Sequence, residues 1–171
     1  SVQTIYFTGK GKAFVAGADI KFFLDQIAKN DLQRIYDFTQ AGHPLLKKIA
    51  ESKKPTVAYL DGLTLGGGLE LALRCHGIVA AQGAWMQFPE VTLGIAPGIG
   101  GMVVPYRRWP RAAGVFHDML RLARKLTAPE ARELGVVDAL AGSYHELLLS
   151  AQARVLELRA ALPRPVEAAV A

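Results

Sequence analysis

The residues best placed to do chemistry surround a run of three glycines in the stretch DGLTLGGGLELAL, residues 61–73. Each glycine destabilises a helix by about 1 kcal/mol relative to alanine, so three at a helix start require a reason. Either the backbone turns sharply there or another group approaches it closely. Because a helix N-terminus with bare N–H groups favours negative charge, this stretch predicts a site that stabilises an oxyanion formed during a reaction.

Two further segments strengthen this interpretation. AFVAGADI, residues 13–20, is a second turn of small residues between a predicted strand and a predicted helix. FPEVTLGIAPGIGG, residues 88–101, carries the carboxylate of Glu90 and continues as a loop rich in glycine and proline. Glu70 places another carboxylate within the first turn after the three glycines. The same set of motifs therefore contains exposed backbone N–H groups and carboxyl groups.

A phosphate-binding loop is the main alternative use of a strand, a glycine-rich turn and a helix start. The stretch LGGGLE, however, matches neither G-x-G-x-x-G nor G-x-x-x-x-G-K-[ST]. Glu70 would also set a carboxylate against the incoming phosphate. The motif therefore disfavours a dinucleotide-binding domain, which would bind NAD or ATP saturably.

The elements that position these residues follow from hydrophobic periodicity. Residues 2–8 alternate and predict a strand, and the apolar runs 56–60 and 78–81 predict buried strands. The pattern also predicts a short strand at 86–88 and helices at 69–75, 111–124, 128–134 and 143–162. Strands that alternate with helices indicate an α/β fold with parallel strand pairs.

Helical spacing also extends over residues 20–52, with a break expected at the AGHP of residues 41–44, because the residue before a proline avoids the helical region. The residues of this segment expected to enter the core are Phe23, Ile27, Ile35, Phe38, Leu46 and Ile49. The segment is thus predicted as an interrupted helix whose apolar residues enter the core.

Composition limits the class of protein. The chain has 171 residues, enough for one domain with a core, and a formal net charge of +5. The basic residues lie in scattered pairs. The sequence lacks the basic helix with interleaved aromatics that would indicate nucleic-acid binding. The sequence contains no apolar run of about 18 residues, so it does not predict a membrane span, and residues 1–9 do not resemble a signal peptide. The four histidines show no metal-ligand spacing, so no metal site is expected.

The lone Cys75 excludes a disulfide within the chain and fits a reducing compartment, so a cytoplasmic location is expected. Because the chain begins without Met, we expect it to be part of a longer protein.

The motifs resemble those of the crotonase, or enoyl-CoA hydratase/isomerase, family. They are AGADI at residues 16–20, KPTVAYLDG running into LGGGLELAL at residues 54–73, and PEVTLGIAPGIGG at residues 89–101. They occur in the order and near the spacing of the family, and LTAPEARELGVVD at residues 126–138 is a weaker match. The resemblance implies a ββα spiral of the ClpP/crotonase type, in the α/β class, with helices at the C-terminus.

The resemblance also assigns the oxyanion site. In the family, two backbone N–H groups polarise the thioester carbonyl of an acyl-CoA. They match Ala18 in the GAD turn and Gly67, the middle glycine of the run. On this interpretation the glycines allow the backbone to approach a carbonyl that becomes enolate-like. One such donor contributes about 3 to 4 kcal/mol to catalysis in a well-studied protease.

Hydratases of the family carry two glutamates, which match Glu70 and Glu90. Two carboxyl groups can act as base and acid on one water when their environments separate their pKa values. We expect Glu70 to activate the water and Glu90 to donate a proton to Cα of a 2-enoyl-CoA. The reaction would belong to fatty-acid beta-oxidation and needs no cofactor, because coenzyme A is part of the substrate.

The resemblance places the adenine part of the coenzyme A site along the second motif. The matching residues are Val15, Ala16, Gly17, Asp19 and Ile20. Gly98 matches a loop glycine that positions the water or the product hydroxyl.

Family domains carry further strands before the point that matches residue 1, so the resemblance implies a fold that is incomplete at the N-terminus. It divides the chain into a partial spiral core at residues 1–125 and a C-terminal helical oligomerisation region at residues 126–171. Family members assemble as trimers or dimers of trimers, and some are fused to a 3-hydroxyacyl-CoA dehydrogenase. Two other functions stay open, an enoyl-CoA isomerase that uses Glu90 as its proton shuttle and a catalytically silent acyl-CoA-binding module.

Overall fold

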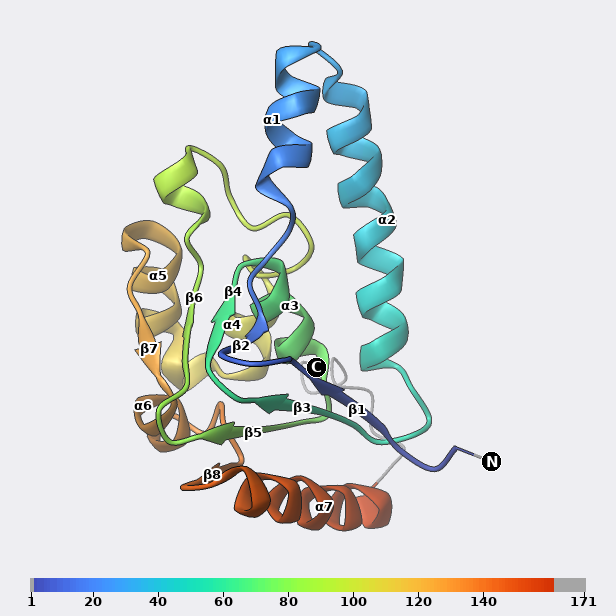
Figure 1. Cartoon of the computed structure of the whole chain (residues 1–171), viewed down its shortest axis with the longest axis vertical. Helices are drawn as coiled ribbons and strands as arrows, with labels where there is room; N and C mark the ends of the chain where they lie inside the picture. The colour runs from blue at the N-terminus through green and yellow to red at the C-terminus, as the bar shows by residue number, and fades with distance from the viewer. Residues whose placement is uncertain (1, 162–171) are drawn as a thin grey trace.

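The computed structural model describes residues 2–161 (Figure 1). Residues 162–171 of the expected C-terminal region lie outside the described part of the chain. No helix within the described residues is long and apolar enough to cross a membrane.

Within residues 2–161, eight strands form two four-stranded sheets. The first sheet has the order β1-β3-β5-β8 and is parallel throughout: β1 (Ile5–Thr8), β3 (Thr56–Leu60), β5 (Gly77–Ala81) and β8 (Ala139–Ala141). The second has the order β2-β4-β6-β7: β2 (Ala13–Val15), β4 (Leu63–Leu65), β6 (Trp85–Gln87) and β7 (Leu126–Thr127), with only β6 and β7 antiparallel. The prediction of an α/β fold with parallel strand pairs is confirmed.

The chain alternates between the sheets. Each long strand of the first sheet is followed by a short strand of the second: β1 by β2, β3 by β4 and β5 by β6. Sequence patterning did not predict β2, β4 or β8, because each is only three residues long and shows no clear alternation.

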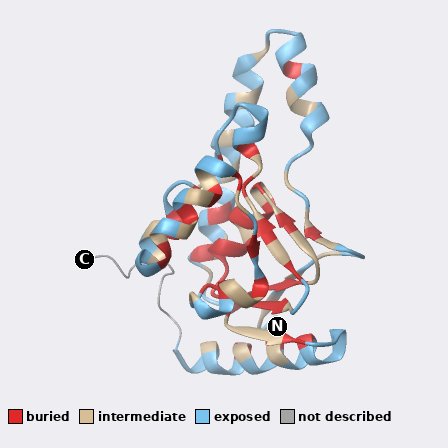
Figure 2. Cartoon of the chain, turned by 90° about the vertical axis from the view of Figure 1, so that its left-hand side faces the viewer, coloured by how far each residue is buried: buried red, intermediate tan, exposed pale blue. Residues whose placement is uncertain are grey.

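The central strands of the first sheet, β3 and β5, are buried on both faces, as is typical of parallel strands, whereas the edge strand β1 leaves Tyr6 and Thr8 exposed. Ala58, Leu60 and Ile78 belong to the main core beneath α3 (Gly67–Arg74). The alternate residues Val57 and Val79 pack in a second cluster with α7 (Tyr144–Ala161). Figure 2 shows this buried interior between the exposed outer faces of the helices.

Further helical segments lie between β6 and β8. They are η1 (Glu90–Leu93), α4 (Val104–Arg108), η2 (Pro110–Ala112), α5 (Ala113–Leu122) and α6 (Ala128–Glu133). Each predicted helix after residue 68 has a counterpart: 69–75 corresponds to α3, 111–124 to η2 with α5, 128–134 to α6 and 143–162 to α7. Elements on both sides of residue 125 share the sheets, since β7 pairs with β6 and β8 with β5. The division into two regions at residue 125 stays a prediction.

The expected break at residues 41–44 is wrong. The break lies instead between α1 (Ile20–Ala28) and α2 (Leu32–Ala50), where Asn30 has φ 54° and the Asp31 side chain accepts a hydrogen bond from Arg34 N at 3.2 Å. Pro44 lies inside α2. The carbonyl of Gln40 loses its helical partner there, but both residues are exposed, so water can reach it.

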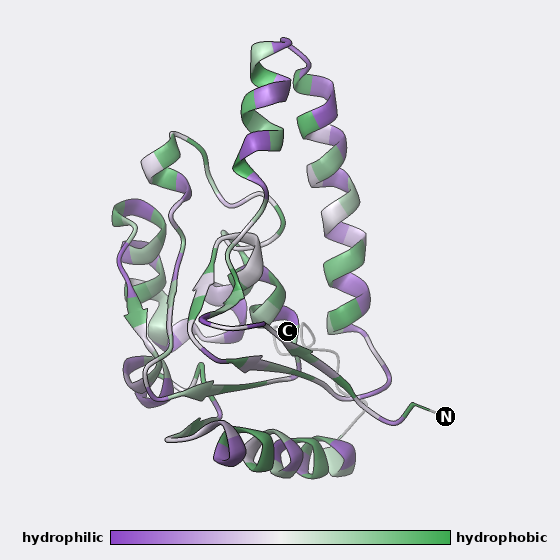
Figure 3. Ribbon diagram, viewed as in Figure 1, coloured by the Kyte–Doolittle hydropathy of each residue, from purple (hydrophilic) through white to green (hydrophobic). Residues whose placement is uncertain are grey.

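The α1–α2 hairpin, residues 20–50, extends away from the sheets (Figure 1). Leu46 near its base is buried as expected, but Ile27 is 54% and Phe38 45% exposed, so the prediction that these two enter the core is wrong. Phe38 instead contacts Phe22 and Phe23, with ring centroids 5.4 and 5.5 Å apart. Figure 3 shows hydrophobic residues along this hairpin as well as in the sheets. The far half of the hairpin packs against itself rather than against the sheets.

Candidate active site

At two of the three glycines that open α3, a side chain would clash with a neighbour, and the neighbour differs between the two positions. Gly66 has φ 49°, and a Cβ on it would lie 2.6 Å from Glu90 Oε1. Gly68 is buried, and a Cβ there would lie 2.6 Å from Val15 Cβ and closer still to the Val15 carbonyl oxygen. The run therefore brings β2 and Glu90 against the first turn of α3.

Gly67, between them, has more open surroundings. A Cβ on it would meet only Glu70 Oε2 and Ile99 Cδ1, each at 3.9 Å. Gly67 is half-buried, whereas its two neighbours are buried. The middle glycine therefore faces the Glu70 carboxylate at the edge of the core.

Glu70 is a buried carboxylate held by backbone N–H groups. It is 4% exposed, and its Oε1 accepts hydrogen bonds from Ile99 N at 2.9 Å and from Gly101 N at 2.7 Å. Both donors come from the loop after η1. Two amide donors on one oxygen leave Oε2, the oxygen nearest Gly67, available to a ligand.

Glu90 lies on the other side of the glycine turn, as the first residue of η1. It is 9% exposed, and its Oε2 has no hydrogen-bond partner among the described residues. Its Oε1 lies against Gly66. A buried oxygen without a partner destabilises the ionised form of the carboxyl group.

The two carboxyl groups differ in electrostatic setting. The pKa of Glu90 is raised to about 7, mainly by burial and also by the nearby Glu70 carboxylate, while its own backbone N–H opposes the rise. The pKa of Glu70 is also raised, because the effect of burial exceeds the opposing effects of the N–H groups of Gly101 and Ile99 and the charges of His43 and Arg74. Glu70 thus has several groups that stabilise its ionised form, whereas Glu90 has only its own backbone N–H.

Residues 15–20 cross this site from β2 to α1. Val15 ends β2 against Gly68, and Gly17 has φ 93°, with its Cβ position 3.5 Å from the Leu65 carbonyl oxygen. Ala16 and Ala18 are exposed on this turn. The segment that carries Ala18 therefore runs beside the segment that leads into Gly67.

The last two residues of the motif begin the first helix. Asp19 is the N-cap of α1, and its side chain accepts a hydrogen bond from Lys21 N at 2.9 Å. Ile20 opens the helix and is 53% exposed. Helix capping is therefore a structural function of Asp19.

The structure places Gly98 directly before Ile99, whose N–H binds Glu70, and against α2. A Cβ on it would lie 3.2 Å from Thr39 Cγ2 of α2. Its neighbour Ile99 packs against Gly42 of the same helix, where a Cβ would lie 2.5 Å from Ile99 Cγ2. The hydrogen bonds to Glu70 come from Ile99 and Gly101, which the sequence analysis did not identify. The GIGG of residues 98–101 was the available signal, because such a run permits amides to turn toward one acceptor.

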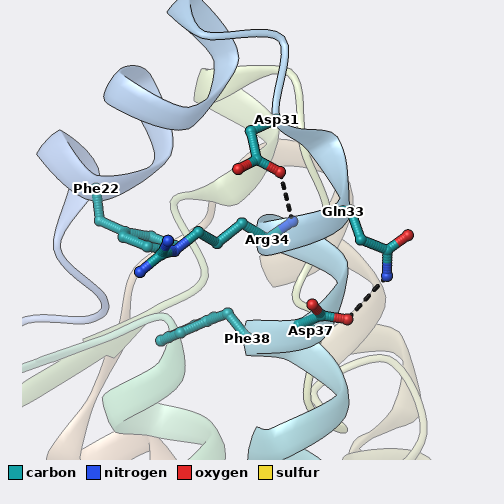
Figure 4. Close-up of a pocket in the computed structure, with 6 residues that line it drawn as sticks. All are labelled: Phe22, Asp31, Gln33, Arg34, Asp37 and Phe38. Atoms are coloured by element: carbon teal, nitrogen blue, oxygen red, sulfur yellow. Dashed lines mark hydrogen bonds between the residues drawn. The ribbon is translucent and has the colours of Figure 1, made fainter.

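Among the described residues, no group of three His, Cys, Asp or Glu side chains is arranged to hold a metal ion. A pocket of about 480 Å³ lies on the α1–α2 hairpin, lined by Phe22, Asp31, Gln33, Arg34, Asp37 and Phe38. In Figure 4 the Arg34 side chain extends across it toward Phe22. None of its lining residues belongs to the predicted site.

Comparison with known proteins agrees with this geometry. The family model described as enoyl-CoA hydratase/isomerase matches residues 1–170. A peroxisomal fatty acid beta-oxidation multifunctional protein of Arabidopsis thaliana is 38% identical over 81% of the chain, and a probable enoyl-CoA hydratase of Bacillus subtilis is 35% identical over 89%. An enoyl-CoA hydratase structure from Geobacillus kaustophilus has a TM-score of 0.77 at 35% identity and covers 92% of the chain.

The chain spans only part of these relatives. It covers 19% of the Arabidopsis protein, 57% of the Bacillus protein and 58% of the Geobacillus structure. The match nevertheless extends over nearly all of this sequence and includes the glycine turn, both glutamates and the loop that binds Glu70. The chain belongs to the enoyl-CoA hydratase/isomerase family.

Proposed function

We propose that this chain is the hydratase part of an enzyme that adds water across the double bond of a 2-enoyl-CoA in fatty-acid beta-oxidation. The observation that carries the proposal is the pair of buried carboxyl groups on either side of the glycine turn, Glu70 beside Gly67 and Glu90 beside Gly66. Their different surroundings favour one ionised and one protonated group, which is the arrangement that water addition requires.

In this proposal the thioester oxygen of the substrate accepts hydrogen bonds from the N–H groups of Ala18 and Gly67. The two residues lie on neighbouring segments, because Val15 packs against Gly68 and Gly17 against Leu65. The partial positive charge of the α3 N-terminus adds to the stabilisation of the enolate oxygen.

The proton transfers use one carboxyl group each. The Glu70 carboxylate takes a proton from water through Oε2 while the water oxygen bonds to Cβ of the enoyl group. The carboxylic acid of Glu90 then donates its proton to Cα, which gives the 3-hydroxyacyl-CoA. Proton exchange with solvent restores Glu70 to its ionised form and Glu90 to its protonated form. A pKa of about 7 keeps Glu90 partly protonated near neutral pH, which suits a proton donor.

The remaining predicted residues would bind the substrate rather than react with it. We assign the coenzyme A adenine to the turn of Val15, Ala16, Gly17, Asp19 and Ile20, and the positioning of the water to Gly98 together with Ile99. No cofactor is required, since the thioester itself activates the double bond.

An enoyl-CoA isomerase is the second candidate, because one observation favours it. Glu90 has an oxygen without a partner among the described residues and a pKa of about 7, which suits a single group that both removes and returns a proton. In such an enzyme Glu70 would be held by its two amide donors without exchanging protons.

For the larger protein we propose a fusion to or association with a 3-hydroxyacyl-CoA dehydrogenase and a trimer-based assembly. The names of the multifunctional relatives support the first part. Exposed apolar residues on α7, including Leu149 at 50% and Leu156 at 67%, support an oligomer contact. Sedimentation of the full-length protein would measure its oligomeric state.

For the compartment we propose the cytoplasm, supported by the buried free thiol of Cys75. The peroxisomal and mitochondrial names of some relatives define the alternatives. Imaging of the full-length protein with a fluorescent tag distinguishes these locations.

The test is the loss of the conjugated-thioester absorbance of crotonyl-CoA, measured on the full-length protein and on Glu70→Gln, Glu90→Gln and Glu133→Gln. Glu133 is an exposed glutamate of α6 and serves as the matched control. We expect both active-site variants to lose at least about a hundredfold in kcat and the control to keep it. Isomerase activity retained by Glu70→Gln would support the second candidate, and coenzyme A ester binding without turnover would indicate a silent module.

A further inference from the structure

Arg74 is a buried cation that the proposed reaction does not use. It is the last residue of α3 and is 8% exposed. Glu70 lies four residues earlier on the same helix, a spacing at which oppositely charged side chains face each other. A buried guanidinium is costly unless other groups compensate its charge, so its position calls for an explanation.

The guanidinium packs against the loop that binds Glu70. A Cβ on Gly100 would lie 2.8 Å from Arg74 Nη2 and 3.4 Å from its Nε. Gly100 has φ 129°, a conformation that other residues rarely adopt. Its two neighbours, Ile99 and Gly101, donate the hydrogen bonds to Glu70 Oε1. One side chain therefore supports the turn from which both of these bonds come.

Arg74 also acts on Glu70 through its charge. Its positive charge lowers the pKa of Glu70, as does that of His43 on α2, and Glu70 in turn raises the pKa of Arg74. The other charged groups that influence Arg74 are Glu51 at the end of α2 and Arg107 on α4, which act in opposite directions. On the far side of the glycine turn, the Glu70 charge acts on Glu90.

We propose that Arg74 is a positioning residue for Glu70: its guanidinium holds the Gly100 turn so that the amides of Ile99 and Gly101 reach the carboxylate, and its charge favours the ionised form of that carboxylate. The inference rests on the proposed function in assigning Glu70 as the base. Removal of Arg74 would weaken the base without removing any group that touches the substrate.

The test compares Arg74→Met, Arg74→Lys and Arg107→Met in the full-length protein. Arg107 is an exposed neighbour on α4 and provides the matched loss of one charge. We expect Arg74→Met to lower kcat about tenfold, as the loss of an orienting contact does elsewhere, while KM stays within about twofold. Because Glu70 must be ionised to act, the acid limb of kcat/KM should move to higher pH in Arg74→Met and stay in place in Arg107→Met.

Arg74→Lys separates charge from shape. It keeps the positive charge but lacks the planar fork of arginine, so the acid limb should stay at the wild-type pH. Its kcat should lie between the kcat of Arg74→Met and that of Arg107→Met. If Arg74→Met fails to fold, a lysine variant with wild-type kcat overturns the proposal.

A second readout does not depend on turnover. The carboxyl carbon of Glu70 is titrated by ¹³C NMR, assigned with Glu70→Gln, in wild type and in both arginine-to-methionine variants. An unchanged Glu70 titration in a folded Arg74→Met overturns the inference. If the wild type fails to hydrate crotonyl-CoA, the proposed function fails, whereas the shift of this titration still decides whether Arg74 positions Glu70.

Discussion

The α3 region and the α1–α2 hairpin are both built from amphipathic helices, yet they have opposite surroundings. In α3, Leu69, Ala72 and Leu73 are fully buried within the main core. On α1, Leu24 is 60% and Ile27 54% exposed. The difference arises because strands from distant parts of the chain surround α3, whereas the far half of the hairpin has only its own partner helix to contact (Figure 2).

This contrast shows where the chemistry resides. The two glutamates, the glycine turn and Arg74 all belong to the buried region, where low solvent exposure shifts pKa values and amides hold a carboxylate in place. The hairpin contributes to the site mainly through its inner side, where Gly42 and Thr39 contact the 98–101 turn. Its outer residues are not required to hold the glutamates.

We expect the largest effect on stability from a substitution at a glycine of α3, which is compared with the same substitution at a glycine of the hairpin. Gly68→Ala places a Cβ against the backbone and side chain of Val15, which belongs to a strand of the second sheet and cannot move away easily. We expect this substitution to lower the free energy of unfolding by about 3 kcal/mol, the cost of overpacking a core. Urea denaturation at neutral pH measures it.

Gly42→Ala is the matched substitution in α2. The new Cβ would meet only side-chain atoms of Ile99, which lies on a loop rather than in a strand and can shift with it, and alanine also favours the helix by about 1 kcal/mol. We therefore expect the free energy of unfolding to change by less than about 1 kcal/mol. Equal losses for the two variants would show that the hairpin is packed as rigidly as α3.

The same contrast explains how much could be predicted from sequence. The glycine motif placed Glu70 in the first turn of a helix, because that strand, turn and helix are contiguous in sequence. Glu90 comes after a further strand, and only the family resemblance connected it with Glu70. The periodicity of residues 20–50 predicted helices but not their exposure. Burial of Ile27 or Phe38 would need neighbours from other parts of the chain, and helical spacing carries no information about them.

The contacts that hold Glu70 were beyond local patterns for a similar reason. Ile99 and Gly101 lie about thirty residues after Glu70, and their N–H groups reach it only because the loop after η1 folds back over α3. The sequence alone shows Arg74 as a charged residue near the end of a predicted helix, with no sign of a role in the site. Only its packing against Gly100 indicates its connection with the site.

The next largest effect is the pH dependence of the free energy of unfolding that the buried carboxyl group of Glu90 causes. The pKa of Glu90 is about 7 in the folded protein and about 4.5 in the unfolded chain. Between these values the folded state retains a proton that the unfolded state has lost, so the free energy of unfolding falls as pH rises through this window and is level above it. Glu90→Gln removes this dependence and should be more stable than wild type by about 2 kcal/mol at pH 8.

Urea denaturation at pH 4.5 and pH 8 measures the difference. Asp25→Asn on the exposed side of α1 is the control from the hairpin, and it should change the free energy of unfolding by less than about 0.5 kcal/mol at both pH values. A Glu90→Gln variant with no advantage at pH 8 would mean that solvent reaches this carboxyl group in the folded protein.

The smallest expected effect is a gain in stability within the hairpin. Pro44 interrupts the hydrogen bonding of α2 at an exposed position, so Pro44→Ala restores an N–H donor for the Gln40 carbonyl. Because water already reaches that carbonyl, we expect a gain of about 1 kcal/mol rather than the full cost of a proline in a helix. Pro105, by contrast, lies in the first turn of α4 and is buried, where proline fits a helix well. Pro105→Ala should therefore lower the melting temperature while Pro44→Ala raises it, and a lower melting temperature for both variants would show that Pro44 is stabilised by its surroundings.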